Sequence, residues 1–176
     1  MKILLLTTTH SGLSQRTYFE LVERGHSVYV QPATSDAAIE AAVAFYQPQL
    51  IIASFIRRAV PATVQQNYPI INVRSVNGTD RGASKLDGTL AENLQCWRIT
   101  FSQVSKERKS LNNSISHSIE MPRKNRKIFY KHHMAQAVVN DILEAVEKYD
   151  RKTFAANALQ TIDSMIKTRL QSVYLS

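Results

Sequence analysis

The chain has 176 residues, 44% of them hydrophobic, and a formal net charge of +8. This length suits one domain with a sizeable core and is too short for two domains of ordinary size. No apolar run approaches the roughly 18 residues that a membrane-spanning helix needs. The single cysteine, Cys96, excludes an internal disulfide and a thiolate metal cluster. We therefore expect a cytoplasmic protein that is not inserted in a membrane.

The excess of basic side chains lies in the C-terminal part. Residues 1–100 carry a net charge of +2 and residues 101–176 carry +6, with clusters at KERK (106–109) and RKNRK (123–127). A basic surface can attract nucleic acid or a small anionic ligand, and it can equally be a solvated face. Nucleic acid is not favoured, because no motif with base-reading side chains is present.

The first half of the chain alternates between apolar runs and helical segments. Four β-rich runs predict buried strands: KILLLTTT (2–9), HSVYVQ (26–31), PQLIIASF (48–55) and PIINV (69–73). Helices are predicted between them over 14–25, with Gly25 as a stop, over 35–46, with Ser35 or Asp36 as a cap, and after Pro61. Strands separated in this way predict right-handed β-α-β units and a parallel sheet.

The second half has a different order of elements. Its patterns predict a helix over 84–94, strands over 96–105 and 112–122, and helices over 127–149 and 152–171. We expect an α/β fold with a domain over 1–150. A C-terminal helix over 151–176 would pack on that domain, on a second copy of the chain or on another protein.

Two segments are candidate ligand sites from their residues alone. The loop TTTHSGLSQR (7–16) opens a helix, where Ser11 and Gln15 could bind an anion or simply cap the helix. It lacks the G-x-G-x-x-G and P-loop patterns, so a dinucleotide or a nucleoside triphosphate is not supported. Arg57 and Arg58 follow the third strand, where ligands bind in open α/β sheets, and could clamp an anion or be solvated. The five histidines do not form a metal set.

Three segments resemble a known family in order and in spacing: LSQRTYFELVERGHSV (13–28), QPQLIIASFIRRAVPATV (47–64) and DRGASKLDGTL (80–90). They resemble the 10-formyltetrahydrofolate-dependent formyltransferases, and within them the N-terminal domain of the HypX/HoxX family of hydrogenase-maturation proteins. The resemblance covers roughly residues 1–150. It implies a Rossmann-like formyltransferase fold, with a mostly parallel sheet flanked by helices and further helices at the C-terminal end. It also implies 10-formyltetrahydrofolate or a related folate as cofactor.

The same resemblance implies where ligand and chemistry lie. Catalysis in the family uses an Asn, a His two residues later, and an Asp from a later loop, which stabilise a developing oxyanion and move a proton. Asp80 and Arg81 belong to a DRG motif beside that site. The formyl donor's pterin would lie against the segment Phe55, Ile56, Arg57, Arg58 and Ala59.

The chain departs from this pattern at two catalytic positions. Asn72 matches the family's Asn, but Arg74 stands in place of the His, and Leu111 falls where the Asp is expected. We expect a site that still binds a folate or another anion but transfers a formyl group weakly or not at all. An acid placed elsewhere, such as Glu107 or Asp80, would contradict that expectation.

Three hypotheses about function follow, and whether the chain is an enzyme stays open among them. The first is a folate- or anion-binding pseudoenzyme. The second is an active formyltransferase, or a formyl-tetrahydrofolate-cleaving enzyme, that uses arginines for oxyanion stabilisation. The third is a non-catalytic interaction module with a basic surface.

Overall fold

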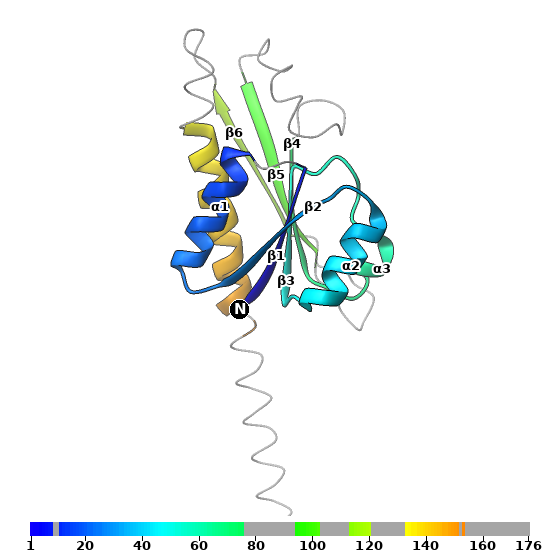
Figure 1. Cartoon of the computed structure of the whole chain (residues 1–176). Helices are drawn as coiled ribbons and strands as arrows, with labels where there is room; N and C mark the ends of the chain where they lie inside the picture. The colour runs from blue at the N-terminus through cyan, green and yellow to red at the C-terminus, as the bar shows by residue number, and fades with distance from the viewer. Residues whose placement is uncertain (9–10, 76–93, 103–112, 121–132, 152, 154–176) are drawn as a thin grey trace, which may run out of the picture. The chain divides into compact units, whose positions relative to one another are not determined.

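The computed structural model describes residues 1–8, 11–75, 94–102, 113–120, 133–151 and 153. Its centre is a six-stranded sheet made of β1 (Lys2–Thr7), β2 (Ser27–Pro32), β3 (Leu50–Ser54), β4 (Ile70–Ser75), β5 (Leu94–Ser102) and β6 (Asn113–Glu120). The strand order is β2-β1-β3-β4-β5-β6 (Figure 1). The first four strands in this order are parallel, and β5 and β6 continue the sheet in antiparallel pairing. The α/β class and the parallel arrangement of the first four strands are confirmed.

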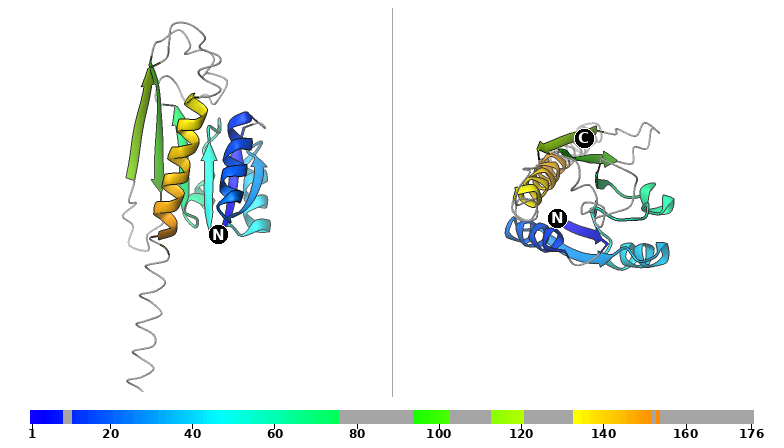
Figure 2. Two further views of the ribbon diagram at one scale, coloured as in Figure 1. Left: turned by 90° about the vertical axis from the view of Figure 1, so that its left-hand side faces the viewer. Right: turned by 90° about the horizontal axis from the view of Figure 1, so that it is seen from above.

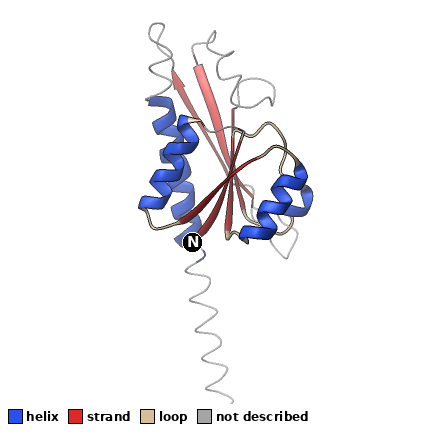
Figure 3. Ribbon diagram, viewed as in Figure 1, coloured by secondary structure: helices blue, strands red, loops and turns tan. Residues whose placement is uncertain are grey.

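Helices connect the parallel strands, as the alternating pattern predicted. They are α1 (Gly12–Glu23), α2 (Asp36–Tyr46) and the short α3 (Ala62–Gln65), and residues 133–151 are also helical. In two perpendicular views α1 lies on one face of the sheet, and α2 and α3 lie on the other (Figures 1 and 2). Colouring by secondary structure shows helices on both sides of the parallel part of the sheet (Figure 3). Both faces of the parallel strands are therefore covered, which explains why β1 and β3 are buried along almost their whole length.

The ends of α1 are set by local side chains. The Ser11 hydroxyl accepts the Ser14 N–H at 3.2 Å, and the Ser14 hydroxyl accepts the Ser11 N–H at 2.9 Å. At the other end Gly25 adopts a φ of 81°, a left-handed conformation that glycine adopts with little strain. The His26 N–H then donates to the Leu21 carbonyl at 3.2 Å, which closes the helix. The predicted stop at Gly25 is confirmed.

The start of α2 resolves the alternative between two cap residues. Ser35 is the N-cap, because its hydroxyl accepts the Ala38 N–H at 3.0 Å. Asp36 is the first residue of the helix, where a carboxylate interacts favourably with the helix dipole.

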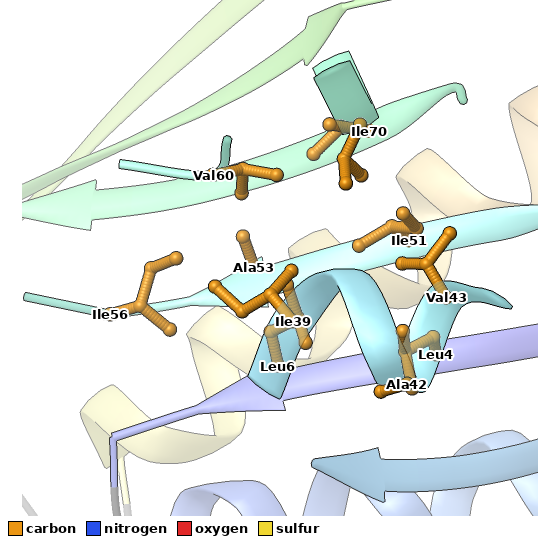
Figure 4. Close-up of a cluster of buried hydrophobic side chains, with 11 residues drawn as sticks. Leu4, Leu6, Ile39, Ala42, Val43, Ile51, Ala53, Ile56, Val60 and Ile70 are labelled. Carbon is orange, nitrogen blue, oxygen red and sulfur yellow. The ribbon is translucent and has the colours of Figure 1, made fainter. Parts of the chain in front are cut away.

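One hydrophobic cluster joins the sheet to α2 and α3 (Figure 4). Leu4 and Leu6 of β1 lie opposite Ile51 and Ala53 of β3, so these residues share one face of the sheet. Full burial of an aliphatic side chain of this size stabilises the fold by about 1.5–3 kcal/mol. The other buried members of the cluster are Ile39, Ala42, Val43, Ile56, Val60, Val64 and Ile70.

The residues that alternate with this cluster lie on the α1 face. Ile3 and Leu5 of β1 are fully buried there, because successive side chains of a strand point to opposite faces. Arg16 of α1 donates from Nη1 to Oε1 of Gln136, at 3.1 Å, which connects α1 to the helical segment over 133–143. In that segment Met134 and Val138 are buried at the spacing of four that the sequence predicted.

The chain divides into a compact unit over Met1–Leu143 and a second unit over Glu144–Ser176. Most of the predicted C-terminal helix over 151–176 lies outside the described residues, and so does the predicted helix over 84–94, apart from Leu94. Leu94 is the first residue of β5, so at this position the helix prediction was wrong. No helix in the described part of the chain is long and apolar enough to cross a bilayer.

Candidate functional site

The carboxyl ends of β1, β3 and β4 form the edge of the sheet at which ligands are expected. Thr7 pairs with Ser54, and Ser54 pairs with Val73, so β1 and β3 end level with each other and β4 continues two residues further, to Ser75. The strand order has a switch point between β1 and β3. From β1 the chain first adds β2 on one side, and it then adds β3 and β4 on the other side of β1. In open α/β sheets the region beyond the strand ends at such a switch point is the usual place for a ligand.

The turn out of β3 is built around an unusual backbone conformation at Phe55. This residue has a φ of 48°, which a bulky side chain rarely adopts. Its N–H donates to the Val73 carbonyl at 3.0 Å, and its carbonyl accepts the Thr8 hydroxyl at 2.9 Å. Phe55 is therefore held from both sides, by β4 and by the end of β1. Strained residues held in this way are frequent at functional sites.

The segment after Phe55 is anchored on the α2 and α3 face. Phe55 and Ile56 are only 4% and 9% exposed, so both residues are largely buried. Arg57 and Ala59 are exposed. Arg58 donates from Nη1 to Oδ1 of Asp36 on α2 at 2.5 Å, in an ion pair open to solvent on both sides.

Asn72 and Arg74 lie on β4 beside that segment. Asn72 is opposite Ala53 in the register, so its side chain lies on the α2 and α3 face of the sheet, with Ile70. Arg74 is two residues further along and falls on the same face, because side chains alternate along a strand. Asn72 is partly buried and Arg74 is exposed, with Val73 fully buried between them on the opposite face.

The structure thus brings most of the residues predicted for the ligand and the chemistry to one face at one edge of the sheet. Asn72, Arg74 and the segment 55–59 lie at this edge, and their roles in ligand binding and catalysis stay a prediction. Ser11 and Gln15 belong to α1 on the opposite face, and Ser11 acts as a helix cap. Asp80, Arg81 and the family's acidic position at Leu111 lie outside the described residues.

Three residues at this edge were missed by the sequence reasoning. The Thr8 hydroxyl holds the Phe55 carbonyl, Asp36 pairs with Arg58, and Arg98 of β5 is directly opposite Arg74. Each hydrogen bond, ion pair or strand pairing of these three joins residues at least 22 positions apart, and no local pattern signals it. Among the described residues no group of three or more His, Cys, Asp or Glu is placed to hold a metal ion.

Comparison with known proteins shows which proteins this chain is similar to in sequence and in fold. No protein-family model matches the chain. Hydrogenase maturation factor HoxX of Bradyrhizobium diazoefficiens is 30% identical over 169 residues, which are 96% of this chain and 30% of HoxX. HypX from Aquifex aeolicus, solved in complex with tetrahydrofolic acid, aligns at 30% identity with a TM-score of 0.67, over 86% of this chain and 27% of that chain.

Two formyltransferases share the fold at lower identity. Methionyl-tRNA formyltransferase from Clostridium thermocellum is 12% identical with a TM-score of 0.57, over 85% of this chain and 66% of that chain. Phosphoribosylglycinamide formyltransferase from Streptococcus pneumoniae TIGR4 is 15% identical with a TM-score of 0.56, over 84% and 98% respectively. The chain spans less than a third of HoxX and of HypX. It has the Rossmann-like formyltransferase fold and resembles HypX and HoxX across a segment of their length.

Proposed function

We propose that the protein is a folate-binding, formyltransferase-like module whose centre has lost ordinary formyl transfer. One observation carries the proposal: Arg74 stands beside Asn72, on one face and at the ligand-binding edge of a formyltransferase sheet. A relative with this fold, HypX, was crystallised with tetrahydrofolic acid, which supports a folate as the ligand.

The chemistry of the two side chains explains the expected loss of transfer. Asn72 can donate its amide N–H to a formyl oxygen as negative charge develops there. A guanidinium can also donate hydrogen bonds and positive charge, but it does not exchange its proton near neutral pH. The His that the family pattern places at position 74 would perform that exchange. Loss of a general acid–base group typically lowers the rate about 10²–10⁴-fold.

The segment 55–59 would provide the wall for the pterin. Its Phe55 backbone is fixed by Thr8 and Val73, and the buried Ile56 anchors it to the core. A wall fixed before binding reduces the entropy lost when a ligand is ordered. This arrangement favours retained binding even where proton transfer is lost.

Calorimetry and a single-turnover assay on the full chain test this function. Titration with 5-formyltetrahydrofolate should show saturable binding, and incubation with 10-formyltetrahydrofolate should release little formate. Arg74→His should raise the rate of formyl loss about tenfold or more, because it restores a group that can exchange protons near neutrality. Arg24→Ala, at the C-cap of α1, controls for the loss of one positive charge. No heat of binding at millimolar folate would rule out the folate-binding module.

The second candidate is an active enzyme that uses arginines to stabilise an oxyanion. The observation in its favour is that Arg74 and the exposed Arg57 belong to segments on the same face and edge of the sheet. Formyl release by the unmodified chain that Asn72→Ala abolishes would support this enzyme. Release unaffected by both Asn72→Ala and Arg74→Ala would exclude it.

A further inference from the structure

The loop between β3 and α3 is held by buried side chains on both sides of an ion pair. Ile56 and Val60 are 9% and 3% exposed and belong to the hydrophobic cluster of Figure 4. The three residues between them are more exposed, and Arg58 is the middle one. Its guanidinium donates from Nη1 to Oδ1 of Asp36 at 2.5 Å. The ion pair therefore connects the middle of this loop to the first residue of α2.

Asp36 lies at the same edge of the sheet as the proposed folate site. β2 is parallel to β1, so α2 begins at the carboxyl edge, where the Ala33 N–H donates to the Thr7 carbonyl at 2.8 Å. The segment 55–59 is attached to the end of β1 as well, through the Thr8 hydroxyl. The ion pair is a further connection, which joins the start of α2 directly to that segment.

An ion pair in this position affects the loop more than it affects the stability of the whole domain. The side chains of Arg58 and Asp36 are 39% and 65% exposed, and exposed pairs contribute little to folding. Within the loop, however, the residues on either side of Arg58 are exposed as well. A long side chain that is ordered before binding spares the ligand an ordering cost, which corresponds to about threefold to tenfold in affinity.

We propose that Asp36 is a positioning residue for the folate site: through Arg58 it holds the segment 55–59 in the conformation that receives the ligand. The resemblance gives Asp36 no part in the site. As the first residue of α2, its carboxylate is stabilised by the helix dipole. This role rests on the proposed function for the identity of the ligand, and it adds a residue of α2 to a site formed by the ends of β3 and β4.

Glu40 provides a matched control on the same helix. It lies four residues after Asp36, and residues at this spacing are neighbours on a helix surface. Its carboxylate accepts the Thr63 hydroxyl of α3 at 2.6 Å, so it contacts α3 rather than the segment 55–59. Asp36→Ala and Glu40→Ala each remove one negative charge and one exposed polar contact from α2.

Calorimetry with 5-formyltetrahydrofolate and urea denaturation, both on the full chain, test the role together. We expect Asp36→Ala to weaken folate binding about threefold to tenfold, with a urea midpoint close to that of Glu40→Ala. Glu40→Ala should leave folate affinity unchanged. Arg58→Ala and the double variant with Asp36→Ala should weaken binding by the same factor as Asp36→Ala alone, because the two residues act through one contact.

Four results would overturn the positioning role. Unchanged affinity in Asp36→Ala would mean that the ion pair does not hold the segment for the ligand. Higher affinity in Asp36→Ala would mean that this carboxylate competes with the ligand for Arg58. Equal weakening by Glu40→Ala would indicate a general effect of charge on α2. Losses that multiply in the double variant would mean that Asp36 and Arg58 act independently.

The outcome for Asp36 is distinguishable from that for the proposed function. Folate binding by the unmodified chain, together with unchanged affinity in Asp36→Ala, overturns the positioning role alone. If the unmodified chain binds no folate, the proposed function is overturned, and the positioning role for folate is overturned with it.

Discussion

Replacing Thr8 by valine tests how the segment after β3 is held in place. The Thr8 hydroxyl donates to the Phe55 carbonyl at 2.9 Å, and valine has nearly the same shape without the donor. Loss of the hydrogen bond itself lowers the free energy of unfolding by about 1 kcal/mol. A partly buried carbonyl left without a donor costs about 1–3 kcal/mol. We expect Thr8→Val to lower the free energy of unfolding by about 1–2 kcal/mol.

Thr8→Val should affect the backbone at Phe55 more than it affects the stability of the whole domain, because Phe55 has a strained conformation. A left-handed conformation at a non-glycine residue costs about 1–3 kcal/mol, comparable to what the Thr8 bond supplies. Without that bond, Phe55 should leave this conformation more often and break its N–H bond to Val73. Hydrogen exchange at the Phe55 amide should therefore accelerate more than exchange at Ile52 in the centre of β3. Folate affinity should fall as well.

Thr63→Val is the matched control for this prediction. The Thr63 hydroxyl donates to Glu40 at 2.6 Å on the exposed surface, where its loss should lower stability by less than about 0.5 kcal/mol. Urea denaturation measures both variants. If Thr8→Val matches Thr63→Val in stability and leaves Phe55 exchange unchanged, the Thr8 bond does not hold the segment.

Three further substitutions, two of them paired with a control substitution, test the fold and the role of α1. Gly25→Ala should lower stability by about 1–2 kcal/mol in thermal unfolding, because Gly25 has a φ of 81°. Gly12→Ala, at the start of α1 with nothing within 4 Å of an added Cβ, should be neutral or slightly stabilising. Ser11→Ala should lower stability by about 1 kcal/mol through loss of the cap, with folate affinity unchanged. A drop in affinity measured by calorimetry would instead give Ser11 a ligand role. Ile51→Ala, at a fully buried position, should lower stability in urea by about 2–5 kcal/mol, and Phe45→Ala, 80% exposed, should change it little.

The retained Asn72 and the altered position at Arg74 were identified from sequence resemblance, and the structure adds how they are presented. It places both residues on one face of β4 and anchors the neighbouring segment 55–59 through buried Ile56. It also shows that Arg58 is engaged by Asp36, so this arginine would have to exchange partners to bind a ligand. Any role of Asp80 and Arg81 in the site stays a prediction.

Local patterns determined which segments form strands and helices in the first half of the chain. Apolar runs marked β1 and β3, and the cap at Ser35 and the stop at Gly25 marked helix ends, because each depends on residues a few positions apart. Strand pairing was decided only by the tertiary structure. The pairing of Arg74 with Arg98 and the hydrogen bond between Thr8 and Phe55 both depend on how distant segments are aligned. The strand register is set by the burial of whole faces of the sheet, which a local sequence pattern does not reveal.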